Sequence, residues 1–185
     1  LTSGYNSVLI GKNTGDALTT GFHNVAFGHN ALGTAVSGCY NVAIGTDALG
    51  GALTTGIDNA AVGHAAMDAL TTGICNVAIG TNALGASTTG CLNVAIGQLA
   101  MGGAVTTGIN NVAIGQSSMD ALTSGIGNIG IGPNALGVST TGNYNVAIGV
   151  TTMGGADTTG TDNIAIGRTA MDALTTGVDN IAIGQ

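Results

Sequence analysis

The sequence has almost no charge, no tryptophan and a single proline. Lys and Arg together number two, and all nine acidic residues are Asp, which gives a formal net charge of −7. Nucleic-acid binding through a basic surface is excluded, because almost no side chain could neutralise phosphates. With one proline and 34 glycines among 185 residues, the chain is neither a collagen nor a proline-rich linker.

Long apolar runs are also missing. None approaches the roughly 18 residues that span a bilayer, so we expect no membrane insertion. The frequent glycines and the scarcity of Lys, Arg and Glu make helices improbable. Hydrophobic residues nevertheless make up 44% of the chain and charged residues only 6%. This balance argues against intrinsic disorder.

What the sequence contains is one unit, repeated eleven times. A glycine recurs at steps of 17, 17 and 18 residues, a second glycine follows each one seven residues later, and three units form a larger period of 52 residues. Units this short cannot hold two helices, whereas a strand, a turn, a second extended segment and another turn fill them. We therefore predict an all-β fold, a parallel β-solenoid or β-roll of about eleven coils of 17–18 residues. It forms a single domain over residues 1–185, without visible caps.

Aligned units show which positions are apolar. A Val or Ile column and a mostly Ile column two residues later flank a column that is Ala in nine units. Residues two apart in a strand share a face, so we predict Val and Ile in a narrow core and Ala on a flat outer surface. A separate Leu or Met column is also predicted to be core. The predicted core residues are Val25, Ile44, Val77, Ile79, Leu84, Val94, Ile96, Met101, Val112, Ile114 and Met119.

Two polar or small columns are predicted to have structural roles. Glycines at the corners suit tight turns with positive φ. An Asn that begins nearly every strand would stack on its equivalents and hydrogen-bond along the solenoid axis. The predicted turn glycines are Gly56, Gly63, Gly73, Gly80, Gly90 and Gly97. The predicted Asn ladder comprises Asn59, Asn76, Asn93 and Asn111.

The repeated motif resembles that of known surface proteins. Asn-Val-Ala-Ile-Gly at 76–80, followed by two variable residues and Ala-Leu, resembles the head repeats of trimeric autotransporter adhesins and equally the repeats of phage tail fibres. The resemblance covers essentially the whole chain. It implies a left-handed β-roll with Val and Ile inside, packed as three chains side by side. The Ala column would then be a chain–chain contact.

Catalytic and metal sites find little support. With no Glu and three His, the chain has few candidates for general acid–base catalysis, and nothing pairs a nucleophile with a base. We expect neither enzyme activity nor a cofactor. Cys39, Cys75 and Cys91 are an odd number that could replace small apolar residues or form an intermolecular disulfide. Asp162 and Asp179 stack in one column, as a solvated edge or as ligands for Ca²⁺.

One Asp column is filled only in every third unit, at Asp16, Asp68, Asp120 and Asp172. The period of 52 residues has two explanations that the sequence leaves open. It records the duplication of a three-coil segment, or every third coil contacts a partner. The second explanation makes Asp68, Asp120 and Asp172 candidate contact residues.

These features favour a structural, non-enzymatic protein that forms an extracellular or virion-surface fibre by end-to-end or lateral packing of its own copies. The alternative is an adhesin or tail-fibre segment that recognises a cell-surface glycan, with the variable column from Asn6 to Asp179 as its recognition edge. Thr-Thr corners raise a third function, ice binding, although such a pair presents only one Thr outward per coil. Both ends fall inside the repeat. This is expected for an excerpt, for a processed chain or for subunits that stack end to end.

Overall fold

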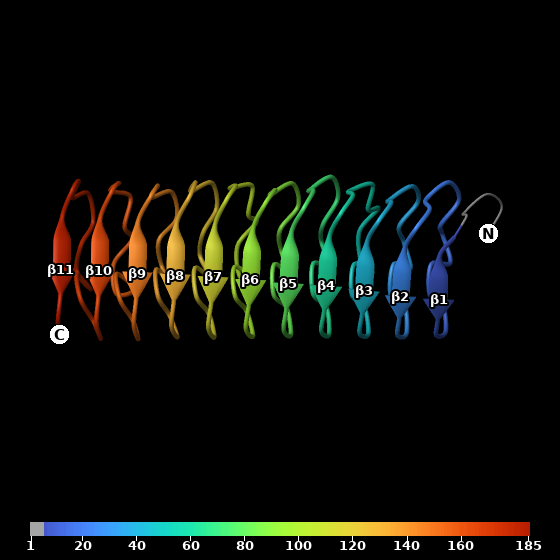
Figure 1. Cartoon of the computed structure of the whole chain (residues 1–185), viewed down its shortest axis with the longest axis horizontal. Helices are drawn as coiled ribbons and strands as arrows, with labels where there is room; N and C mark the ends of the chain where they lie inside the picture. Colours follow the sequence, from blue (N-terminus) through green and yellow to red (C-terminus); the bar gives the residue numbers. More distant parts are fainter. Residues whose placement is uncertain (1–5) are drawn as a thin grey trace.

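The computed structural model describes residues 6–185 and shows a rod of stacked coils (Figure 1). Eleven strands lie side by side along it and pair in parallel, in sequence order. This confirms the predicted all-β parallel solenoid, with about ten turns of about 17 residues. The strands are β1 (Val8–Ile10), β2 (Val25–Phe27), β3 (Val42–Ile44), β4 (Ala60–Val62), β5 (Val77–Ile79), β6 (Val94–Ile96), β7 (Val112–Ile114), β8 (Ile129–Ile131), β9 (Val146–Ile148), β10 (Ile164–Ile166) and β11 (Ile181–Ile183).

Both sides of each coil are hydrogen-bonded to the next coil. On the strand side, β5 and β6 pair residue for residue, so that Ala78 lies beside Ala95. On the return side, the Leu84 amide donates to the Ala100 carbonyl over 3.0 Å, and the Met101 amide donates to Ser118 over 2.9 Å. The columns read from the sequence are therefore columns in space.

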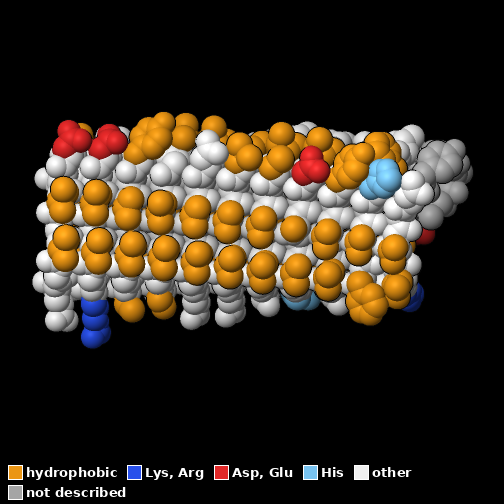
Figure 2. Space-filling model, viewed as in Figure 1, with side chains coloured by type: hydrophobic (Ala, Val, Ile, Leu, Met, Phe, Trp, Pro, Cys, Tyr) orange, Lys and Arg blue, Asp and Glu red, His pale blue; other side chains and the backbone are white. Residues whose placement is uncertain are grey.

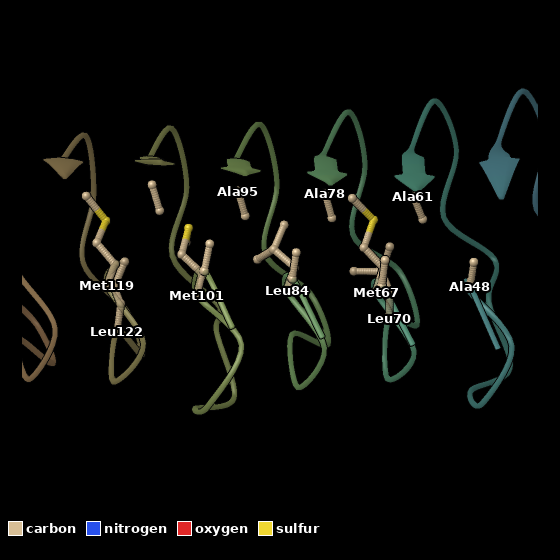
Figure 3. Close-up of a cluster of buried hydrophobic side chains, with 14 of the residues drawn as sticks. Ala48, Ala61, Met67, Leu70, Ala78, Leu84, Ala95, Met101, Met119 and Leu122 are labelled. Atoms are coloured by element: carbon tan, nitrogen blue, oxygen red, sulfur yellow. The ribbon is translucent and has the colours of Figure 1, made fainter. Parts of the chain in front are cut away.

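The interior is built from the Ala column and from the Leu or Met column opposite. Ala78, Ala95, Leu84, Met101 and Met119 have no exposed surface. Figure 3 shows Ala61, Ala78 and Ala95 pointing from the strands toward the leucine and methionine side chains of the return side. A small side chain of the strand thus faces a large side chain of the return side across the interior.

The prediction that Val and Ile form the core was wrong, because both columns lie on the outer face of the strands. Val25 and Ile79 each keep 42% of their surface exposed. The two sides of a coil lie so close that a Leu or Met leaves room only for a methyl group opposite. The predicted core residues found on the outer face are Val25, Ile44, Val77, Ile79, Val94, Ile96, Val112 and Ile114.

The first coil shows this limit on volume by breaking the pattern. It has Leu9 where nine coils have Ala, and Gly15 where the others have Leu or Met. A Cβ on Gly15 would lie 2.8 Å from a methyl carbon of Leu9. The large residue has changed sides, and the total volume in the coil is kept.

The two glycine columns serve different purposes. Gly80, with φ 135°, needs a backbone conformation that L side chains rarely adopt, as predicted for a turn. The same holds for Gly63 and Gly97. The prediction of positive φ was wrong for Gly56, Gly73 and Gly90. At Gly73 a Cβ would collide with the Gly90 carbonyl oxygen, so this column is kept free of side chains by the next coil.

Candidate functional site

The most distinctive surface is a flat apolar face made by the outward side chains of the eleven strands. We call it the Val/Ile face and define it by the first and third residue of each strand. Figure 2 shows it as two unbroken rows of hydrophobic side chains along the rod. Charged side chains lie only at the borders of this view.

Each of these side chains is shielded from solvent only by its equivalents on the neighbouring coils. In the middle of the rod, Val94, Ile96, Val112 and Ile114 are partly buried, whereas Ile183 in the last strand is 75% exposed. With coils about 4.8 Å apart, the two columns cover on the order of 500 Å². An apolar patch of this size is comparable to the largest one on a typical monomeric protein, and such patches are often functional.

Two edges border the face and carry its nearest charges. The upper edge, at the top of Figure 2, consists of the two residues before each strand-leading Asn and includes Asp58, Asp162 and Asp179, all exposed. The lower edge consists of the residue after the second glycine of each coil and includes Lys12 and Arg168. The face itself carries no charge.

The Asn ladder, found as predicted, fixes the upper corner of every coil. Asn93 is fully buried, and its backbone amide donates to Asn76 Oδ1 over 3.0 Å. Its Nδ2 donates to the Gly108 carbonyl over 2.8 Å, and its Oδ1 accepts the backbone amide of Asn111 over 3.0 Å. Asn59 continues the same pattern by accepting from Asn76. The ladder holds adjacent strands at one height and so keeps the Val/Ile face flat.

Within the described residues, the variable upper edge contains one aromatic cluster. The His23 and Tyr40 rings stack with centroids 5.1 Å apart, and Phe22 meets Tyr40 edge-on at 5.4 Å. Tyr40 is 51% exposed. Further along the same edge, Tyr144 stands without a ring contact among the described residues and is 59% exposed.

The Thr-Thr corners place one hydroxyl outward per coil, as the alternation of an extended segment predicts. Thr71 is half-buried and its hydroxyl donates to the Thr88 carbonyl over 2.9 Å, while Thr72 is exposed. The hydroxyl row is therefore single. The two-column array of this molecule is instead the apolar one.

The candidate contact residues Asp68, Asp120 and Asp172 face the preceding coil of their own chain. A Cβ added to Gly51 would lie 2.5 Å from the Asp68 carboxylate oxygens, and one added to Gly103 would lie 2.7 Å from those of Asp120. Burial raises the pKa of Asp68, and the nearby Asp47 carboxylate raises it further. The Gly51 amide and His64 act in the opposite direction on this pKa.

We expect mild acid to stabilise the rod around Asp68. A pKa raised in the folded state means that the charged carboxylate disfavours folding at neutral pH. This penalty disappears as the pH falls through the folded pKa toward the unfolded value of about 4. Thermal unfolding should therefore occur at higher temperature near pH 4.5 than near pH 7, with a smaller difference in Asp68→Asn. Asp58→Asn, on the exposed upper edge, controls for the loss of one negative charge, and an equal difference in all three proteins would contradict the assignment.

Other candidate groups are dispersed. Within residues 6–185, no three His, Cys or Asp side chains gather closely enough to hold a metal ion. Asp162 and Asp179 lie on neighbouring coils of the exposed upper edge. The three cysteines are free: Cys39 is buried, Cys91 partly buried and Cys75 exposed. No pocket interrupts the described surface, and none of the described segments forms a helix that could cross a membrane.

Two comparisons with known proteins found no match. No protein-family profile matches the chain, and no curated protein sequence is significantly similar to it. The likeness of the repeat motif to adhesin and tail-fibre repeats thus stands on the motif alone.

The sequence-based prediction placed the Val/Ile face in the core, although one feature of the sequence indicates that it lies outside. The paired exchange at Leu9 and Gly15 shows that the Ala and Leu/Met columns face one another across the interior. Because residues alternate between the two faces of a strand, the Val and Ile side chains must then point outward. The prediction instead followed the general tendency of apolar β-branched residues to be buried.

Proposed function

We propose that this chain is a structural, non-enzymatic rod that packs laterally against copies of itself through the Val/Ile face, as part of an extracellular or virion-surface fibre. The observation that carries the proposal is the continuous apolar face on a rod whose interior is already filled. The extracellular or virion location rests on the likeness of the motif to adhesin and tail-fibre repeats.

A second copy is the occupant that fits this face best. Another copy presents the same rows at the same spacing, so side chains of one can lie between those of the other along the whole rod. The face has no charge to oppose such contact, and its charged residues lie at the edges, where solvent reaches them. The two columns supply over half of the roughly 800 Å² per partner of a typical stable interface. The half-exposed upper edge adds to it.

Association through this face is tested by placing charge on it. We expect Val94→Asp with Val112→Asp to shift the protein from oligomer to monomer in sedimentation equilibrium, because buried unpaired carboxylates oppose the contact. The circular dichroism spectrum of this double variant should match that of the parent protein, because the strands stay folded. Thr89→Asp, on the exposed hydroxyl row away from the face, should remain oligomeric. A parent protein that is monomeric at high concentration would refute the proposal.

Electron microscopy of the purified protein at neutral pH tests the fibre itself. Filaments or bundles with an axial repeat of about 4.8 Å are expected for coils that stack and pack laterally. Short rods of one length would limit the role to a segment of a larger assembly. Unassociated particles with an exposed Val/Ile face would oppose both forms.

A receptor-binding role is the second candidate and rests on the exposed aromatic residues of the upper edge. Aromatic rings with one face in solvent are suited to stacking on sugars, and Tyr40 is held in place by its contacts with Phe22 and His23. A glycan array with the assembled protein tests this role. Binding that is lost in Tyr40→Ala would support it, and an array without binding would remove it.

A further inference from the structure

Three kinds of coil alternate along the rod and differ only on the return side. Asp coils contain the Asp of the period of 52 residues and span 56–72, 108–124 and 160–176. Middle coils follow them and span 21–37, 73–89 and 125–141. Gly-Gly coils come next, are one residue longer, and span 38–55, 90–107 and 142–159. The strands on the other side show no such alternation.

Each Asp coil contacts a feature found only in the Gly-Gly coil before it. The carboxylate of Asp68 lies against Gly51, that of Asp120 against Gly103 and that of Asp172 against Gly155. A Cβ on any of these glycines would lie within 3.0 Å of the carboxylate, so a larger residue there would force the Asp side chain to move. The additional residue of the Gly-Gly coil provides this space.

A second contact joins the same two coils. The Thr106 hydroxyl of a Gly-Gly coil donates to the Leu122 carbonyl of the following Asp coil over 2.9 Å. Thr54 and Thr158 make the equivalent bonds to Leu70 and Leu174. In the Asp coils this interior position is a leucine, which cannot donate.

The step from a middle coil to a Gly-Gly coil has its own bond. Ser87 donates to the Thr106 carbonyl over 3.0 Å, and Ser139 donates to Thr158 over 2.6 Å. From residue 56 onward the interior position therefore reads Leu, Ser, Thr in the three kinds of coil, whereas the middle coil 21–37 has Ala35 there. The hydroxyl partners along this column change with the kind of coil.

The carboxylates depend on this neighbour for their environment. One oxygen of Asp68, Asp120 and Asp172 is buried against the preceding coil without a hydrogen-bond partner. Asp16 occupies the same column in the first coil, and its side chain is exposed. A coil without the glycine pair has a side chain at this position, which leaves less room for the carboxylate of a following Asp.

We propose that the Asp and Gly-Gly pair, together with the Thr bond beside it, is the recognition element by which one coil selects the next. The top of a Gly-Gly coil is an interaction surface whose fitting partner is an Asp coil. The elements shared by nearly all coils, such as the Asn ladder and the Ala column, fit any neighbour. Without a selective contact, a coil could pair with the wrong coil of its own chain or with a coil of another copy. Buried polar groups are well suited to prevent such mispairing.

Single-coil deletions in the full chain test this recognition. Deleting the middle coil 73–89 leaves every Asp coil on a Gly-Gly coil. Deleting the Gly-Gly coil 90–107 places Asp120 on the middle coil instead. Both proteins lose one coil and keep all shared columns, so we expect the second to unfold several degrees lower than the first. Deleting the three coils 73–124 should be the least harmful for its length, because every junction is retained.

Equal unfolding temperatures for the two single-coil deletions would overturn the proposal. Point variants of the full chain provide an independent test that needs no deletion. Gly103→Ala should lower the unfolding temperature, and adding Asp120→Ala should restore part of the loss because the colliding carboxylate is gone. Gly137→Ala, in a middle coil where a Cβ meets only its own turn, is the matched control. Additive effects of Gly103→Ala and Asp120→Ala would contradict a direct contact.

Discussion

Replacing Ala95 with aspartate is expected to abolish folding of the central coils, whereas the same change at the next residue, Ile96, leaves the rod folded. Ala95 has no exposed surface and faces the leucine and methionine side chains of the return side. A carboxylate there is buried without a partner, and we expect a loss of at least about 4 kcal/mol in local unfolding free energy. Ile96 points outward, so its replacement adds a charge to the surface of the monomer.

The pair of variants is a matched control in itself, because both residues lie in β6. Hydrogen exchange by mass spectrometry reports the loss coil by coil, which suits a rod in which each coil contacts only its neighbours. The Ala95 variant should lose protection in β5 to β7, and the Ile96 variant should keep it. The opposite result would place Ile96 in the interior.

Loss of one side-chain amide from the Asn ladder is expected to cost about 2–6 kcal/mol of unfolding free energy. In Asn93→Ala, the Asn111 amide and the Gly108 carbonyl both lose their partners inside the rod. Each unsatisfied buried group costs about 1–3 kcal/mol. In chemical denaturation, the first unfolding transition should occur at a lower denaturant concentration, because the two parts of the rod on either side of this coil then unfold separately.

Gln98→Ala is the control for removal of an amide, since Gln98 is exposed on the lower edge. Its unfolding should match that of the parent within about 0.5 kcal/mol. A small effect of Asn93→Ala would show that water replaces the missing amide, and the ladder would then contribute little to the stability of the corners.

The sequence is sufficient to predict the coils but not which side of a strand is inside. Glycine spacing fixes the length of each unit, and the Asn and glycine columns follow from their regular recurrence. Alternation of Val, Ala and Ile defines two faces of a strand without assigning either one. That assignment depends on the width of the interior, which is set by the return side, where Leu84 and Met101 already fill the space.

The structural role of the 52-residue period also could not be predicted from the sequence. Asp68 and Gly51 are 17 positions apart, and nothing in the sequence shows that the carboxylate contacts that glycine rather than a partner molecule. Their contact depends on the stacking of two return segments. The longer Gly-Gly coil was visible as a step of 18 residues, but its role as space for a neighbouring side chain was not.

The orientation of the strands across the rod has a mechanical consequence. Tension applied to the two ends pulls each coil away from the next, so the bonds between coils open in turn rather than all at once. A coil that occupies about 4.8 Å of the rod releases a chain of roughly 55 Å when it unwinds. Under load the rod would lengthen about tenfold in small, repeated steps, one coil at a time.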